Sequence, residues 1–271
     1  MVFKSNQELV NYLKERGVLR TKEIINAFLK IDRKDFVKEE YIDQAYFDTP
    51  LPTLMGQTIS QPYVVAFMLE LLQPQKGQKI LDIGFGSGWT TSLLAEITQT
   101  DADYTQTYAD NIYPNDYRIN YPNKKPNNKT FGQNSGNKFG SDSGNSLSPR
   151  ESASSPRRSA SGKVYGIEIV PEVFEFGKKN IEKYNFLQKG IVEIFLMDGS
   201  KGLPEKAPFD RILVSAAAKK IPEELISQLK DNGILVIPDF EGIWKIKKIN
   251  GKIEKEYHYG FVFVPLTTDK R

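Results

Sequence analysis

Residues 81–89 read Leu-Asp-Ile-Gly-Phe-Gly-Ser-Gly-Trp and place glycines at three alternate positions after an aspartate. The apolar segment Lys79–Ile83 before this turn predicts a β-strand, and the apolar residues after it predict a helix. Glycines allow backbone N–H groups to approach a ligand closely, and a helix start favours such an approach. The stretch therefore predicts a site for a nucleotide-like ligand at the carboxyl end of the first strand of an open α/β sheet.

The spacing of the glycines differs from the G-x-G-x-x-G pattern of dinucleotide-binding folds, because Trp89 stands where the third glycine would be. The observed D-x-G-x-G-x-G resembles the first motif of class I S-adenosylmethionine methyltransferases. This resemblance implies that Gly84, Gly86 and Gly88 hold the methionine portion of the cofactor. It also implies that Asp82 acts near the cofactor's ammonium group, directly or through water. Taken alone, the motif leaves a dinucleotide enzyme and a tight structural turn open.

The composition favours one catalytic domain. The chain has 271 residues, 39% of them hydrophobic and 26% charged, which is enough for one sizeable core. No apolar run is long enough to cross a bilayer and residues 1–19 do not resemble a signal peptide, so a cytoplasmic protein is expected. With no cysteine and His258 as the single histidine, no metal site is expected. The net charge of +3, with both signs interspersed, gives no reason to expect nucleic-acid binding.

Residues 98–162 interrupt the pattern of strands and helices. They are rich in Asn, Ser, Gly, Asp, Tyr and Pro and lack apolar periodicity, which predicts a disordered insertion. A tolerated surface loop is the favoured interpretation because loop length costs little closure entropy. A partner-binding or phosphorylated arm, suggested by Ser148-Pro149 and Ser155-Pro156, stays open.

Removing this insertion restores a familiar spacing. Glu168 then lies about 20 residues after Gly84, at the end of the strand expected over residues 164–168, where an acidic residue binds a ribose in such folds. The alternative is an ordinary exposed glutamate at a strand end.

The rest of the chain alternates strands and helices. Strands are expected over residues 191–196, 209–215 and 233–238, and helices from Pro171 and over residues 222–230. Residues 244–249, the turn Asn250-Gly251 and residues 252–257 predict a hairpin, which the apolar run 261–264 follows. The predicted fold class is α/β: a doubly wound, mostly parallel seven-stranded sheet of the Rossmann-like, class I methyltransferase kind, with an antiparallel C-terminal edge.

Upstream, apolar residues at helical spacing, among them Leu9, Leu13 and Phe28, predict a helical extension over residues 1–62. The predicted methyltransferase domain then comprises residues 63–97 and 163–271. The extension ends in Gly56-Gln57-Thr58-Ile59-Ser60-Gln61-Pro62, which places hydroxyls and amides before a helix that begins near Pro62. Such groups can converge on a carboxylate. A plain capping turn would also account for Ser60.

Further short motifs are spread over nearly the whole chain outside the insertion. They are Arg33-Lys34-Asp35-Phe36-Val37, Ala45-Tyr46, Pro50-Leu51-Pro52, Asp198-Gly199, Ala207-Pro208-Phe209-Asp210, Ser215-Ala216-Ala217-Ala218 and Leu235-Val236-Ile237-Pro238. With the Gln-Thr-Ile-Ser run at residues 57–60, they resemble the protein-L-isoaspartate (D-aspartate) O-methyltransferase family. Two features depart from the family pattern: Thr53-Leu54-Met55 before the Gly-Gln pair, and the long insertion.

The resemblance implies that S-adenosyl-L-methionine donates a methyl group to the α-carboxylate of isoaspartyl residues in damaged peptides and proteins, a repair reaction. Ser60 would be the active-site hydroxyl, and Gln57, Thr58 and Ile59 would complete the substrate-binding loop. Glu168 would bind the cofactor ribose. Asp198 and Gly199 would border the adenine. A carboxylate with a reference pKa of about 3.5 to 4 is already ionised at neutral pH, so no general base is needed.

Three further expectations concern partners and alternatives. A monomer that binds isoaspartyl peptides, without nucleic acid or membrane, is expected. A methyltransferase with another acceptor, a small carboxylate or RNA, is the first alternative, and the only basic cluster that could serve RNA is Lys245, Lys247, Lys248 and Lys252. A cofactor-binding homologue without catalysis is the second.

Overall fold

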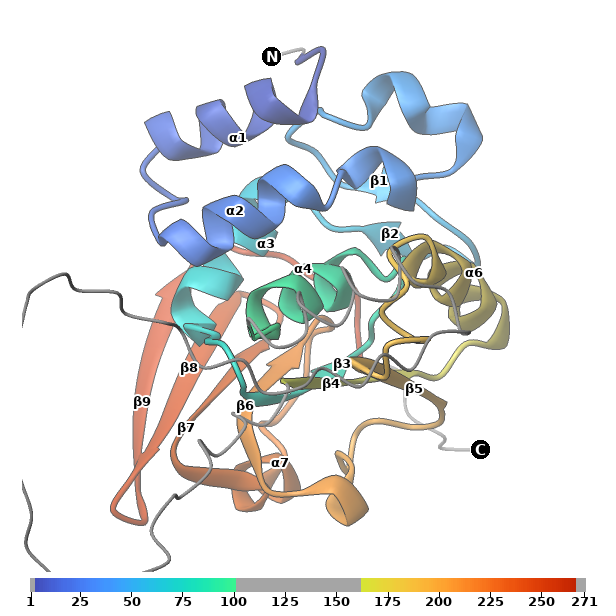
Figure 1. The fold of residues 1–271 in the computed structure, drawn as a ribbon. Helices are drawn as coiled ribbons and strands as arrows, with labels where there is room; N and C mark the ends of the chain where they lie inside the picture. The colour runs from blue at the N-terminus through green and yellow to red at the C-terminus, as the bar shows by residue number, and fades with distance from the viewer. Residues whose placement is uncertain (1–2, 101–161, 267–271) are drawn as a thin grey trace, which may run out of the picture. The chain divides into compact units, whose positions relative to one another are not determined.

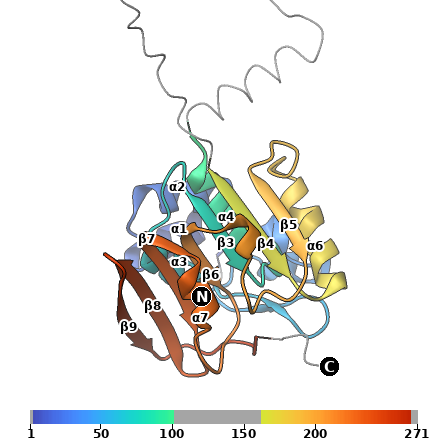
Figure 2. The same cartoon turned by 90° about the horizontal axis from the view of Figure 1, so that it is seen from below.

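A sheet of seven strands lies at the centre of the fold. The computed structural model describes residues 3–100 and 162–266. The strands are β3 (Lys79–Ile83), β4 (Lys163–Glu168), β5 (Val192–Leu196), β6 (Phe209–Val214), β7 (Leu229–Pro238), β8 (Gly242–Ile249) and β9 (Lys252–Tyr259). Their order is β5-β4-β3-β6-β7-β8-β9 (Figures 1 and 2). Strands β3 to β7 pair in parallel and β8 is antiparallel to both neighbours, so the predicted fold class is confirmed.

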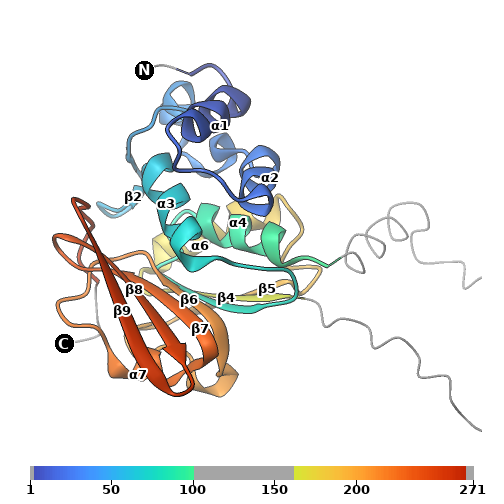
Figure 3. The same ribbon diagram turned by 90° about the vertical axis from the view of Figure 1, so that its left-hand side faces the viewer.

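Helices cover both faces of this sheet. α3 (Pro62–Leu72), α4 (Trp89–Thr98) and α6 (Pro171–Glu182) lie on one face, and α7 (Glu223–Ser227) lies on the other, after the short 3-10 helix η3 (Pro204–Lys206) (Figures 1 and 3). Helices on both faces bury the central strands from both sides, which explains their nearly continuous aliphatic runs. α3 and α6 each begin with proline at the first position, as the sequence predicted.

The N-terminal residues form a helical layer above α3 and α4. It consists of α1 (Asn6–Glu15), α2 (Lys22–Lys30) and the 3-10 helices η1 (Arg33–Phe36) and η2 (Glu39–Gln44). Leu9, Leu13 and Phe28 are buried and share one hydrophobic core with the helices on that face of the sheet. The division into an extension and a methyltransferase domain therefore stays a prediction. Within the described residues, none of the helices is both long and apolar enough to cross a bilayer.

Two boundaries predicted near the C-terminus are wrong. The helix expected over residues 222–230 is only α7, and the strand expected from residue 233 already begins at Leu229. Leu229 pairs with Phe209 before the register shifts, and Asn232 takes a left-handed φ of 62° within the irregular stretch. The Asn250-Gly251 turn has positive φ at both residues, 50° and 75°, which fits the predicted hairpin.

Most of the predicted insertion, residues 101–161, lies outside the described residues. The residues on either side of it come together. A Cβ added to Gly162 would lie 2.3 Å from the carbonyl oxygen of Thr98, the last residue of α4. The same oxygen accepts a hydrogen bond from the Gly77 N–H at 2.9 Å. The chain therefore leaves and re-enters the fold at neighbouring points beside the start of β3.

Candidate active site

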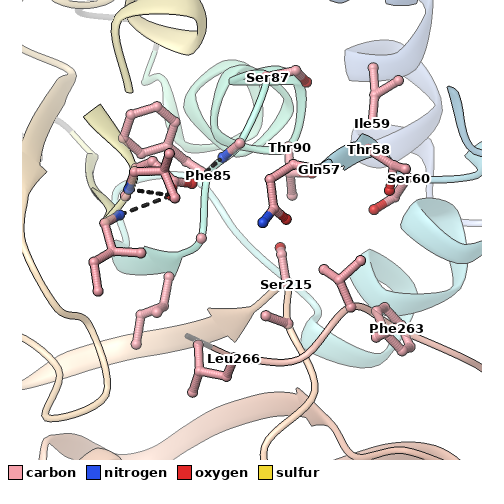
Figure 4. Close-up of a pocket in the computed structure, with 18 of the residues that line it drawn as sticks. Gln57, Thr58, Ile59, Ser60, Phe85, Ser87, Thr90, Ser215, Phe263 and Leu266 are labelled. Carbon is pink, nitrogen blue, oxygen red and sulfur yellow. Dashed lines mark hydrogen bonds between the residues drawn. The ribbon is translucent and has the colours of Figure 1, made fainter. Parts of the chain in front are cut away.

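A cavity of about 530 Å³ opens at the carboxyl ends of β3, β4 and β6. Its walls come from segments far apart in the chain: the glycine turn after β3, the end of β4, the loop of residues 57–61 and the run of residues 262–266 (Figure 4). The parallel strands bring these segments together, because all their carboxyl ends lie at one edge of the sheet.

The three glycines of the turn differ in what lies beside them. Gly84, Gly86 and Gly88 have φ values of 78°, 55° and 85°, which favour glycine. Gly84 and Gly86 line the cavity, and a Cβ on either would meet no atom closer than 3.9 Å. A Cβ on Gly88 would lie 2.7 Å from the Ile181 side chain and 2.8 Å from the Gly177 carbonyl oxygen. Gly88 thus permits close packing of α4 on α6, whereas the first two leave space in the cavity.

Glu168 lies in the cavity wall at the end of β4 and is 7% exposed. One carboxylate oxygen accepts the Gly86 N–H at 3.1 Å, and the other accepts the N–H groups of Ile169 and Val170 at 2.9 and 3.1 Å. These bonds fix the carboxylate against the glycine turn. It still has lone pairs for ligand hydroxyl groups.

Asp82 does not line the cavity but precedes the lining residue Ile83 and is fully buried. Thr91 Oγ1 donates to its Oδ2 at 2.6 Å, while Oδ1 has no hydrogen-bond partner among the described residues. Burial raises the pKa of Asp82 to about 7; the Thr91 hydrogen bond opposes this, and the negative charge of Glu168 adds to it. An unpaired buried acceptor next to the glycine turn fits a positively charged or hydrogen-bond-donating ligand group.

Asp198 and Gly199, which were predicted to border the adenine, differ in their position relative to the cavity. Gly199 lines the cavity, and a Cβ there would lie 2.6 Å from the Ile83 side chain. Asp198 lies outside the lining, where its Oδ1 accepts the Ser200 N–H at 2.8 Å. Asp198 therefore shapes the turn that carries Gly199.

The opposite wall is a small hairpin of β1 (Leu51–Pro52) and β2 (Thr58–Ile59). Its tip is a turn closed by the Gln57 N–H donating to the Leu54 carbonyl at 2.9 Å, with left-handed φ at Met55 and Gly56. The departure from the family pattern at residues 53–55 thus forms the turn itself. It leaves the Met55 side chain 63% exposed.

Arg33 holds this wall, a role that the sequence analysis missed. The buried guanidinium donates to four backbone carbonyls, those of Ala45, Phe47, Thr49 and Ser60, at 2.6 to 3.2 Å. Burial lowers its pKa to about 9, an effect that nearby Asp48 partly opposes. Its Cζ also lies 5.4 Å from the centre of the Trp89 ring at the start of α4. One side chain therefore connects both ends of the loop to the glycine-turn wall.

The hydroxyl of Ser60 does not cap α3. The N-cap residue is Gln61, without a side-chain hydrogen bond, and the Tyr63 N–H donates instead to Asp48 Oδ1 at 2.8 Å. Gln57, Thr58, Ile59 and Ser60 all belong to the cavity lining. No hydrogen bond occupies the Ser60 hydroxyl within the described part of the chain, so it is available to a ligand.

Two contributions to the cavity were not assigned from the sequence, those of Ser215 and of residues 262–266. The Gln57 side chain extends into the middle of the cavity, and Ser215 lies opposite it (Figure 4). The Ser215 N–H donates to the Ile83 carbonyl at 2.9 Å, which fixes Ser215 beside β3. Residues 262–266 close the remaining side, where Ala217 exchanges backbone hydrogen bonds with Val264 and Leu266 at 2.8 Å.

Comparisons with known proteins identify the family of this site. A sequence model described as protein-L-isoaspartate(D-aspartate) O-methyltransferase (PCMT) matches residues 4–106 and 157–271. The chain belongs to the protein-L-isoaspartate(D-aspartate) O-methyltransferase family. The family model does not match residues 107–156, which lie inside the predicted insertion.

Two relatives described as protein-L-isoaspartate O-methyltransferase illustrate this membership. The protein of Thermococcus onnurineus is 35% identical over 95% of this chain and 90% of its own length. The protein of Pyrobaculum islandicum is 36% identical over 95% of this chain and 97% of its own length. Among solved structures, a Plasmodium falciparum chain described under the same family name, in complex with S-adenosyl-L-homocysteine, matches the fold with a TM-score of 0.67. The match covers 98% of this chain and all of that one at 24% identity.

Proposed function

We propose that this enzyme transfers a methyl group from S-adenosyl-L-methionine to the α-carboxylate of isoaspartyl residues in damaged peptides and proteins. The observation that carries the proposal is that one cavity joins the open glycine turn to the loop of residues 57–61. Family membership supports the same reaction.

The glycine-turn wall fits the cofactor. S-adenosyl-L-methionine would supply a methyl group carried on a positively charged sulfur. Gly84 and Gly86 leave room for the methionine portion, and the fixed carboxylate of Glu168 would accept ribose hydroxyls. Gly199 would border the adenine, with Asp198 shaping its turn. Asp82, behind the cavity wall, would act on the ammonium group through its charge or through water, and Gly88 would keep α4 in place.

The loop wall fits a carboxylate. The Ser60 hydroxyl, with the hydroxyl of Thr58 and the amide of Gln57, would donate hydrogen bonds to the isoaspartyl α-carboxylate, and Ile59 would form part of its binding surface. Catalysis would then consist of holding a carboxylate oxygen in line with the methyl group. Such alignment can supply about 7 to 11 kcal/mol of the barrier.

The ionisable groups of the cavity favour an acceptor that needs no deprotonation. Glu168 is the only Asp, Glu, His, Lys, Arg or Tyr among the described residues that line it, and three backbone N–H groups already bind its carboxylate. A hydroxyl or amine acceptor would need a base, whereas a carboxylate is already ionised at neutral pH. The backbone N–H of the following residue would then attack the methyl ester spontaneously and release methanol, which gives a succinimide whose hydrolysis partly restores normal aspartate.

The lysines of β8 give little support to the RNA alternative. Lys245 and Lys247 stand opposite Glu256 and Glu254 of β9, and Lys245 Nζ lies 3.9 Å from Glu256. Alternating charges on paired strands form a solvated edge rather than a concentrated basic surface. A monomeric state and a cytoplasmic location belong to the same proposal.

The test combines binding with turnover. Isothermal titration with S-adenosyl-L-homocysteine should give saturable binding, and a methyl-transfer assay should show turnover of an isoaspartyl peptide but not of its normal aspartyl counterpart. Binding without transfer to either peptide would identify a non-catalytic homologue. Equal transfer to both peptides would contradict specificity for isoaspartate.

A further inference from the structure

A second cavity, of about 540 Å³, lies next to the first. It is bordered by α1, by residues 47–49 and by the start of α3, and Gln61 lines both cavities. Gln61 directly follows Ser60 in the chain. The second cavity is therefore separated from the proposed carboxylate site by the width of one residue.

The lining of this cavity includes an arginine and several residues with hydroxyl groups. The Arg16 guanidinium lies 6.0 Å from the centre of the Tyr63 ring and makes no ion pair with any described residue. Tyr12, Thr49 and Tyr63 also line the cavity, and their hydroxyls have no hydrogen-bond partner within the described ranges. The cavity thus presents a cation and several O–H groups.

The lining contains one carboxylate, that of Asp48, and one of its oxygens already accepts a hydrogen bond. Asp48 Oδ1 accepts the Tyr63 N–H at 2.8 Å, which completes the first turn of α3. The charge of Asp48 also acts on the buried guanidinium of Arg33. Asp48 is therefore attracted toward Arg33 behind the cavity wall, whereas Arg16 makes no ion pair with a described residue.

We infer that the second cavity is a subsite for an acidic side chain of the substrate, close in sequence to the isoaspartate. The inference rests on the proposed function, because it needs the isoaspartyl carboxylate at Ser60. An extended peptide advances about 3.3 to 3.6 Å per residue. A peptide that crosses Gln61 therefore brings a nearby side chain over the second cavity, where its methylene groups contact Tyr12 and Tyr63 and its carboxylate reaches Arg16.

The subsite can be tested with a peptide series and two charge reversals. The peptides carry one isoaspartate and have Glu, Gln or Lys at each flanking position in turn. The variants are Arg16→Glu and, as a matched control, Arg20→Glu. Arg20 is exposed, lies outside both cavity linings and contributes only its backbone N–H to Glu70. The control therefore makes the same change of net charge without changing the subsite.

For the parental protein, KM should be lower for Glu than for Gln at one flanking position, by about twofold to fivefold, with kcat unchanged. Arg16→Glu should abolish this preference and favour Lys, whereas Arg20→Glu should keep it. A Glu preference that survives Arg16→Glu, or equal KM values at every flanking position, would overturn the subsite while normal turnover left the proposed function intact. If no isoaspartyl peptide were methylated at all, the proposed function would fail, and the subsite with it.

Discussion

The two main walls of the cavity are built in different ways. The glycine-turn wall follows β3, which pairs with β4 on one side and β6 on the other, so its position is fixed by many backbone hydrogen bonds. The loop wall contains only the two-residue strands β1 and β2, and Arg33 binds its carbonyls from behind. Stability is therefore distributed in the first wall and concentrated in one side chain in the second. Substitutions in the two walls should therefore have different effects on stability and on ligand binding.

The largest effect should come from Arg33→Met. It removes four hydrogen bonds of a buried guanidinium, one to a buried carbonyl and three to partly buried ones, so we expect the free energy of unfolding in urea to fall by about 3 to 5 kcal/mol. Methyl transfer should be nearly lost in the protein that stays folded. Arg211→Met is the control, because this buried arginine binds the Gln73 carbonyl away from the cavity and should leave kcat/KM unchanged. Parental kcat/KM in Arg33→Met would show that the loop does not depend on Arg33.

In the glycine-turn wall, Gly86→Val should lower cofactor affinity rather than stability. A branched side chain would enter the open space beside Gly86, so affinity for S-adenosyl-L-homocysteine should fall more than about a hundredfold. Gly251→Val is the matched control, since Gly251 also has positive φ with open space around it but lies in the β8–β9 turn. Similar titration curves for the parental protein and Gly86→Val would remove the glycine turn from the site.

Ser60→Ala tests the loop wall without disturbing its backbone. Loss of one donor to a charged acceptor costs about 1.5 to 3 kcal/mol, so kcat/KM for an isoaspartyl peptide should fall about tenfold to hundredfold. Affinity for S-adenosyl-L-homocysteine should not change. If the variant turned over the peptide at the parental rate, the carboxylate would have to be held by other donors of the loop.

Asp82→Asn should change how stability depends on pH. Because the folded pKa is raised to about 7 from 3.8, the unfolded chain loses its proton first as pH rises, and Asp82 increasingly destabilises the fold between these values. The unfolding free energy of Asp82→Asn minus that of the parental protein should therefore grow by about 3 kcal/mol between pH 4 and 7 and level off above pH 7. A constant difference in urea unfolding across this range would show that Asp82 titrates normally.

The smallest effect should come from replacing residues 101–161 with a short Gly-Ser linker. Thr98 and Gly162 already lie together, so kcat/KM should stay within about twofold, since closing a short loop costs little entropy. Loss of activity at an unchanged melting temperature would instead assign these residues to the site.

The elements that the sequence predicted correctly are those with a local sequence pattern. β3 and the starts of α3 and α6 follow from an aliphatic run and from proline at the first helical position, and all lie where they were expected. The burial of Arg33 could not be predicted, because its acceptors lie 12 to 27 residues away in the chain. The early start of β7 likewise depends on the pairing of Leu229 with Phe209, which no local pattern contains.

The wall formed by residues 262–266 is the part of the pocket that is synthesised last. A chain still on the ribosome could complete all seven strands once Tyr259 has emerged, but Val264 and Leu266 would not yet have paired with Ala217. A nascent or prematurely terminated chain ending at Gly260 would thus have a whole sheet and an incomplete pocket. The pocket therefore cannot be complete until after the last strand of the sheet has been synthesised.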